Sequence, residues 1–126
     1  MNLNQVTMPA LHIEQSVAFY RAMGFEQIVD APGYARFACP EGDATFSVHR
    51  VDRRSEGAVI VYFECSALDE RVSELQVRGF TFTKLPADER WLWREARLTD
   101  PAGNVLCLYW AGVNRKYPPW RLVASD

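Results

Sequence analysis

The sequence predicts an α+β fold built from two βαβββ modules in tandem. The first observation is an apolar stripe at Ile13, Val17 and Tyr20, whose i, i+4, i+7 spacing is typical of one helix face. The same stripe, followed each time by Gly-Phe, recurs at one constant offset, at Leu68, Val72, Leu75, Gly79 and Phe80. The second observation is that short runs with strand-like composition follow each helix, separated by turn signals. The repeated order favours two related modules over a generic α+β domain with coincidental spacing.

The first module covers about residues 1–52 of what we interpret as a single domain, residues 1–126. Gly24 is placed to cap the C-terminus of the helix. The turn signals A-P-G and P-E-G-D separate the strands that follow, and a charged connector leads out of the module. The expected elements are a strand at 4–9, a helix at 13–23, strands at 25–30, 34–39 and 44–50, and the connector at 51–57.

The second module covers about residues 57–111 and begins with a strand at 58–65. Ser66 is a suitable N-cap for the second helix, with Asp69 at the third position beyond it. Two aromatic-rich strands follow, and the extra residues of this longer copy are expected within residues 84–90. A C-terminal extension, residues 112–126, lies outside the two-module plan. Its residues 114–122 are expected to cover a sheet edge, to close a cavity mouth, or to carry a dimer contact.

The last strand follows the tight turn D-P-A-G-N at residues 100–104, in which proline presets one φ and glycine supplies a positive φ. Leu106 and Leu108 then point to one face of the strand, and Val105, Cys107 and Tyr109 point to the other. We expect the leucine face to pack on a helix. The other face is expected to line a cavity.

Length, net charge and cysteine content argue against several classes of protein. A chain of 126 residues favours one compact unit, and a net charge of −2 argues against a nucleic-acid partner. No apolar run is long enough for a membrane span, and no signal peptide is visible at the N-terminus. Three widely spaced cysteines without C-x-x-C suggest neither disulfides nor a zinc knuckle, so a cytoplasmic location is expected.

Two stretches carry a family resemblance. Residues 16–25, S-V-A-F-Y-R-A-M-G-F, resemble the first-helix signature of the glyoxalase, bleomycin-resistance and extradiol-dioxygenase (vicinal oxygen chelate) superfamily. Residues 99–108, T-D-P-A-G-N-V-L-C-L, resemble its last-strand signature. The resemblance spans nearly the whole chain. It implies paired modules, a homodimer, and curved sheets that enclose a cavity for a small molecule.

The resemblance also implies where enzymes of this superfamily hold a divalent metal, with His, Glu or Gln from the first and last strands of each module. These positions correspond here to Gln5, Ile60, Cys107, and either Thr45 or Ser47. Ile60 has no donor atom, hydroxyls and a neutral amide are weak ligands, and one cysteine cannot build a site. His49, on the same face as Thr45 and Ser47, could substitute as a ligand, although a rim histidine is the simpler interpretation. We therefore expect no metal and no cofactor.

The metal-free members that this chain resembles are the bleomycin-resistance proteins, which bind a drug without altering it. The similarity is closest at residues 91–103, where a tryptophan precedes the D-P turn. Aromatic walls provide large contact area for a planar ligand, so Trp91 and Trp93 are candidates for such walls or for a dimer interface or core. The other predicted ligand-binding residues, all assigned to the cavity faces, are Gln5, Thr45, Ser47, His49, Ile60, Tyr62, Glu64, Cys107 and Tyr109.

Glu64 is unusual on an otherwise apolar strand, because an inward carboxylate must be paired or solvated. It could bind a cationic guest, pair with Arg94 or Arg97, or lie at an edge. Cys107 with His49 could in principle form a nucleophilic dyad, but such a dyad needs the two groups in hydrogen-bond reach, and we assign no catalytic residue.

Three hypotheses follow. The first is a metal-independent small-molecule-binding protein that sequesters an aromatic or cationic antibiotic-like ligand and is not an enzyme. The second is a divalent-metal-dependent lyase, isomerase or dioxygenase with atypical ligands. The third is a partner-binding protein whose cavity is filled by its own aromatic side chains, Trp120 among them.

Overall fold

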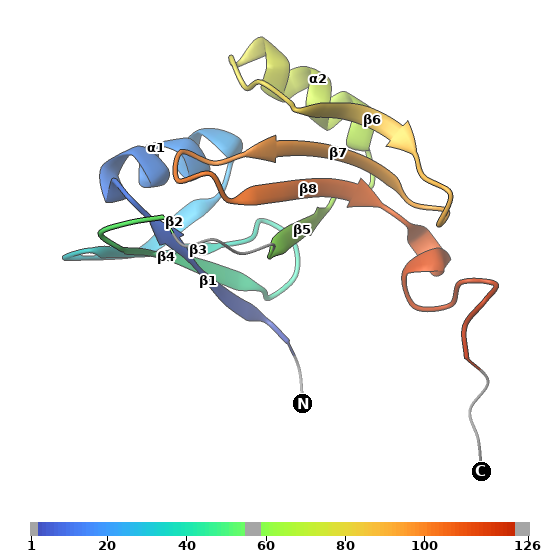
Figure 1. Ribbon diagram of the computed structural model, residues 1–126, viewed down its shortest axis with the longest axis horizontal. Helices are drawn as coiled ribbons and strands as arrows, with labels where there is room; N and C mark the ends of the chain where they lie inside the picture. The colour runs from blue at the N-terminus through green and yellow to red at the C-terminus, as the bar shows by residue number, and fades with distance from the viewer. Residues whose placement is uncertain (1–2, 55–58, 123–126) are drawn as a thin grey trace. The chain divides into compact units, whose positions relative to one another are not determined.

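The computed structural model describes residues 3–54 and 59–122 (Figure 1). The chain forms two compact units, one of Met1–Val59 with Thr99–Asn104 and one of Ile60–Leu98 with Val105–Asp126. Within the described residues each unit holds one four-stranded sheet and one α-helix, with the same order of elements. The predicted α+β fold of two βαβββ modules is therefore confirmed. No helix in the described ranges is long and apolar enough to cross a lipid bilayer.

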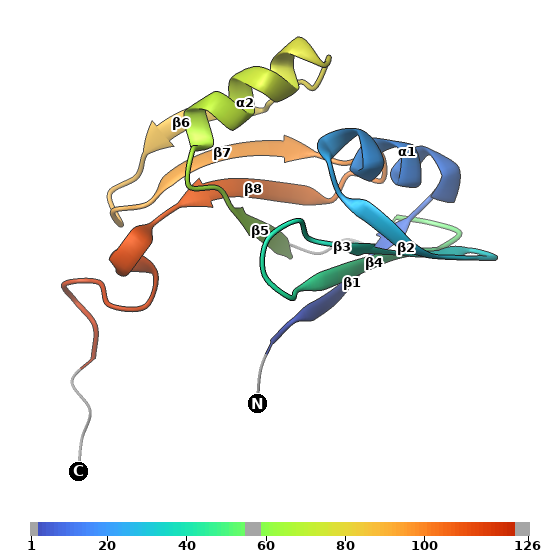
Figure 2. The same ribbon diagram turned by 180° about the vertical axis from the view of Figure 1, so that it is seen from behind.

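The first sheet has the strand order β1-β4-β3-β2, with β1 parallel to β4 and the other neighbours antiparallel. Helix α1 covers one face of this sheet and contacts β2, β3 and β4 (Figure 2). The parallel pairing of β1 with β4 requires the chain to cross over, and the helix and the β2–β3 hairpin supply that connection. The elements of this unit are β1 (Gln5–Ala10), α1 (Ile13–Met23), β2 (Glu26–Ala31), β3 (Tyr34–Ala38) and β4 (Thr45–Arg50).

The second sheet repeats this topology with the order β5-β8-β7-β6, in which β5 runs parallel to β8 and β6 antiparallel to β7. Helix α2 contacts β6 and β8 (Figure 1). A short 3₁₀ helix, Gly112–Arg115, follows the last strand. The elements of this unit are β5 (Ile60–Glu64), α2 (Leu68–Val77), β6 (Lys84–Asp88), β7 (Arg94–Thr99) and β8 (Val105–Trp110).

Each core lies between a helix stripe and one face of its sheet. In the first unit, the ring of Tyr20 packs edge-on against Phe46 at a centroid distance of 4.9 Å, and Phe37 stacks on Phe46 at 5.2 Å. In the second unit, the predicted stripe of α2 is buried, as are the expected leucines of β8. The buried core residues that confirm the predicted faces are Tyr20, Leu68, Val72, Leu75, Leu106 and Leu108, and Phe46 and Val48 of β4 are buried in the same way.

The ends of the two helices were predicted with different success. Gly24 adopts φ 110° and its N–H reaches the carbonyls of Arg21 and Tyr20, so the predicted left-handed cap is confirmed. The prediction for Ser66 was wrong, because α2 begins one residue later than expected and Ala67 occupies the N-cap without a side-chain bond. The carboxylate of Asp69, expected to help cap the helix, instead binds Arg94.

The extra residues of the second module were only partly located. Residues 84–90 do not form a loop, since β6 occupies Lys84–Asp88. The added length lies partly before β6 and partly in the turn at residues 89–93. In that turn Leu92 has φ 67°, its N–H donates to the Glu89 carbonyl at 3.0 Å, and the N–H of Glu89 donates to the Trp93 carbonyl at 2.7 Å.

The predicted D-P-A-G-N turn is present and is held by one buried carboxylate. Oδ1 of Asp100 accepts hydrogen bonds from the backbone N–H groups of Ala102 at 3.0 Å and Asn104 at 2.8 Å. Oδ2 accepts from the Tyr20 hydroxyl at 2.6 Å and from the Asn104 amide at 2.7 Å. The same amide donates to the Pro9 carbonyl at 2.8 Å. This turn therefore ties α1 and β1 together within the first unit.

Candidate functional site

On the first sheet, the face away from α1 carries polar side chains that bond to one another. Nε2 of Gln5 donates to Oγ of Ser47 at 2.8 Å, and the Thr45 hydroxyl donates to the Gln5 side-chain carbonyl. The Tyr34 and Ser47 hydroxyls are 2.7 Å apart, and Nε of Arg36 donates to the Tyr34 hydroxyl at 3.0 Å. The bond with Ser47 and the cationic Arg36 lower the pKa of Tyr34. The polar atoms predicted to face a guest are thus already engaged with each other.

His49 occupies the next position but one after Ser47 on β4 and is exposed. The register pairs it with Tyr34 on β3 and Pro9 on β1. This placement near the strand end agrees with a rim histidine.

On the second sheet, the face away from α2 carries an aromatic cluster, which we define as Tyr62, Trp93 and Tyr109. Trp93 stacks on Tyr109 at a centroid distance of 4.8 Å, with 23° between the ring planes. Tyr62 meets both rings edge-on, at 5.8 Å from Trp93 and 5.5 Å from Tyr109. Tyr62 is 41% exposed, so part of the aromatic cluster faces outward. Burial raises the pKa values of both tyrosines, so the cluster stays uncharged at neutral pH.

Cys107 lies beneath this aromatic cluster and is fully buried. It packs with Tyr109 and Ala111, and with the partly buried Ile60 and Trp93. Its Sγ donates to Oε1 of Glu95 at 3.5 Å. Burial, together with the negative charge of Glu95 and this hydrogen bond, raises the pKa of the Cys107 thiol to about 12. The thiol is therefore held protonated at neutral pH, which does not suit a nucleophile.

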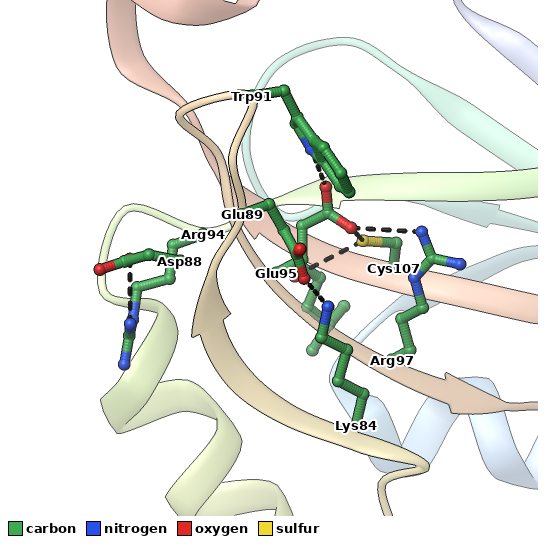
Figure 3. Close-up of polar contacts among 9 residues, drawn as sticks. Lys84, Asp88, Glu89, Trp91, Arg94, Glu95, Arg97 and Cys107 are labelled. Carbon is green, nitrogen blue, oxygen red and sulfur yellow. Dashed lines mark hydrogen bonds and ion pairs between the residues drawn. The ribbon is translucent and has the colours of Figure 1, made fainter.

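Glu95 is the residue that sequence reasoning missed. It is 1% exposed, its Oε2 accepts from the indole N–H of Trp91 at 2.6 Å, and its Oε1 accepts from Arg97 at 3.2 Å (Figure 3). The alternation in R-E-A-R-L could have identified Glu95. Ala96 and Leu98 point to the core, so Glu95, one residue before Ala96, points to the opposite face, which is the face of Cys107. Trp91 is consequently fixed by a buried carboxylate, with 36% of its surface exposed.

Glu64 lies at the end of β5 and is exposed. The two arginines considered as its partners bind other carboxylates. Arg94 binds Asp69 at 2.8 and 2.9 Å and Asp88 at 3.0 Å, while Arg97 binds Glu95. Glu64 therefore lies at the end of its strand, and the predicted pairing with Arg94 or Arg97 is not formed.

The donors at the positions implied for a divalent metal do not fit such an ion. Ile60 offers no lone pair, the Gln5 amide is shared between Ser47 and Thr45, and Cys107 offers a single soft sulfur that donates to Glu95. Among residues 3–54 and 59–122, no group of three or more His, Cys, Asp or Glu side chains is placed to hold a metal ion.

The predicted site residues therefore form two sets, one on each unit. Gln5, Thr45, Ser47 and His49 belong to the first unit, and the remaining seven belong to the second. An open groove of about 720 Å³ between α1 and the β2–β3 hairpin contains none of them.

Comparisons with known proteins agree with this architecture. Residues 2–108 match the family model described as the Glyoxalase/Bleomycin resistance protein/Dioxygenase superfamily. A comparison with curated protein sequences gave no match.

Solved structures with the same fold include the following three. A glyoxalase/bleomycin resistance protein/dioxygenase from Nocardioides is 23% identical with a TM-score of 0.77, covering 98% of this chain and 90% of that one. A bleomycin-binding protein in complex with bleomycin is 18% identical with a TM-score of 0.73, covering 87% and 98%. A bleomycin resistance determinant encoded on the transposon Tn5 is 18% identical with a TM-score of 0.74, again covering 87% and 98%. The family match, which extends over most of the chain, shows that this protein belongs to the Glyoxalase/Bleomycin resistance protein/Dioxygenase superfamily.

Proposed function

We propose that this protein binds a small planar molecule without a metal ion and sequesters it rather than transforming it. The observation that carries this proposal is the aromatic cluster of Tyr62, Trp93 and Tyr109 on the helix-free face of the second sheet. Exposed aromatic surface with fixed ring geometry favours planar guests, because stacking adds about 0.5–1.5 kcal/mol beyond the area buried. Trp91, held by Glu95, adds a second partly exposed ring to the same unit.

Two further observations support binding without metal-dependent or nucleophilic catalysis. The implied ligand positions include a hydrocarbon, an amide that is hydrogen-bonded to Ser47, and one buried thiol, a set of donors that does not suit a divalent cation. The same raised thiol pKa disfavours nucleophilic catalysis by Cys107. The bleomycin-binding protein that shares this fold binds a small molecule, which is consistent with the proposal. A homodimer, a cytoplasmic location and a role in antibiotic tolerance form part of the same proposal.

The test is tryptophan fluorescence and calorimetry with a panel of planar aromatic compounds that includes bleomycin, before and after treatment with a chelator. Binding that survives the chelator, and that falls at least about tenfold in Trp93→Leu, is the expected result. Trp120→Leu is the matched control, because Trp120 is 57% exposed and lies in the C-terminal segment after β8. Stoichiometric zinc, nickel, manganese or iron in the purified protein, with binding that needs it, would instead favour the metal-dependent alternative.

A further inference from the structure

The β6–β7 hairpin places two ion pairs on the same face as Cys107. Lys84 and Arg97 are direct partners in the register of these strands. Lys84 binds the carboxylate of Glu89, and Arg97 binds Glu95 at 3.2 Å. Figure 3 shows these side chains gathered on one side of the hairpin, with Arg94 and Asp88 on the other.

In both pairs the carboxylate is the inner member and the cation the outer one. The side chains of Glu95 and Glu89 are 1% and 17% exposed, whereas those of Arg97 and Lys84 are 30% and 38% exposed. The formal charges cancel, but the charge that can meet a ligand is positive. Such a surface attracts an anion and disfavours a cation.

The hydrogen bonds of Glu95 and Arg97 also favour an anionic ligand over a cationic one. Glu95 already accepts bonds from Trp91, Arg97 and Cys107, so its oxygens are engaged. Arg97 carries five N–H donors. Glu95 engages Nη2, and Nε is buried without a hydrogen-bond partner among the residues that the structure describes, so a ligand would meet the remaining Nη donors of this 30% exposed side chain. Glu95 thus acts as a positioning residue that holds the guanidinium in place.

The Arg97–Glu95 pair adjoins the aromatic cluster, and Lys84 is the register partner of Arg97. Tyr62 belongs to that cluster, and its phenol experiences the charges of both Glu95 and Arg97. Cys107 contacts Glu95 on one side and the Trp93–Tyr109 stack on the other. A ligand whose ring lies on the aromatic cluster would therefore have its substituent near Arg97.

We propose that the guest is a planar aromatic acid, whose ring stacks on the aromatic cluster and whose carboxylate, or an equivalent anionic group, is bound by Arg97 with help from Lys84. This inference rests on the proposed function and specifies its ligand class. Guanidinium is suited to the task because its planar N–H groups match a carboxylate in two-point geometry.

The test compares three ligands with the same ring, namely 2-naphthoate, 2-naphthamide and 2-naphthylmethylammonium, by calorimetry at pH 7.5 and 0.1 M NaCl. The naphthoate is expected to bind about tenfold more tightly than the amide, and the ammonium most weakly. Arg97→Gln is expected to remove the preference for naphthoate over the amide, with a loss of about tenfold in naphthoate affinity and a smaller loss in amide affinity. Lys84→Gln, which leaves the Arg97–Glu95 pair intact, is expected to give a smaller loss and also serves if Arg97→Gln does not fold.

Arg94→Gln is the matched control, because Arg94 is on the same strand but binds Asp69 of α2. It is expected to retain the preference for naphthoate. Equal affinity for all three ligands, a preference for the ammonium, or an equal loss in Arg94→Gln would overturn the anion assignment while leaving the proposed function intact. If none of the three binds, the proposed function and this inference both fail.

Discussion

Removing one hydroxyl group, in Tyr20→Phe, tests whether the buried carboxylate of Asp100 stabilises the first unit. The Tyr20 hydroxyl is 2.6 Å from Oδ2 of Asp100, and both side chains are buried. A hydrogen bond to a charged group contributes about 1.5–3 kcal/mol. Phenylalanine keeps the ring contacts with Phe37 and Phe46, and three donors to Asp100 remain. We therefore expect the free energy of unfolding to fall by about 1.5–3 kcal/mol.

The expected change is large enough to measure by urea or thermal denaturation. With an unfolding entropy of about 2.1 cal/mol/K per residue, this loss lowers the Tm by about 6–11 °C. Tyr117 is an exposed residue and provides a control, and Tyr117→Phe is expected to leave the Tm unchanged. Combining Tyr20→Phe with Asp100→Asn in a double-mutant cycle isolates the coupling between the two side chains.

The same pair predicts an alkaline effect of defined sign. Burial, then the Asp100 charge and the hydrogen bond to it, raise the pKa of Tyr20 in the folded state. This contribution to stability is fully present below the ordinary tyrosine pKa of about 10 and is lost as the pH rises above it. The difference between wild type and Tyr20→Phe should therefore shrink above about pH 10. A loss below about 0.5 kcal/mol at pH 7, with no coupling in the cycle, would refute the role given to this bond.

Three further predictions concern the second unit. The buried Cys107 thiol, with its pKa raised to about 12, should resist N-ethylmaleimide at pH 8 until the protein is unfolded, and mass spectrometry showing it modified as fast as Cys39 would contradict this burial. Leu92 adopts φ 67°, a left-handed conformation that glycine tolerates and a β-branched residue does not. Leu92→Gly should therefore leave the free energy of unfolding unchanged or raise it by up to about 1 kcal/mol, whereas Leu92→Val should lower it. The opposite order in urea titrations would argue against a left-handed residue at this position. The hydrogen bonds from Arg94 lower the pKa of Asp69. The difference in unfolding free energy between wild type and Asp69→Asn should therefore be present above about pH 4 and vanish as the pH falls further. A difference that persists at pH 2 would exclude this ion pair as its source.

Local patterns predicted the elements of the fold well. The helix stripes at Ile13, Val17 and Tyr20 and at Leu68, Val72 and Leu75 depend only on spacing along the chain, and α1 begins and ends where expected. The left-handed cap at Gly24 is likewise a local property of backbone sterics. Ser66 was misjudged because capping requires the helix to start at one particular residue, and packing shifted that start by one position.

The sequence by itself therefore determined the order of the helices and strands, which faces are apolar, and that the pattern occurs twice, because these follow from periodicity among near neighbours. Only the tertiary structure decided what the helix-free faces present. The decisive contacts are hydrogen bonds between side chains on different elements. They join Glu95 to Trp91 and Cys107, Gln5 to Ser47, and Arg94 to Asp69. Strand register decides which of these side chains lie close together, and buried polar groups must then form hydrogen bonds with one another. Neither condition can be read from a single stretch of sequence.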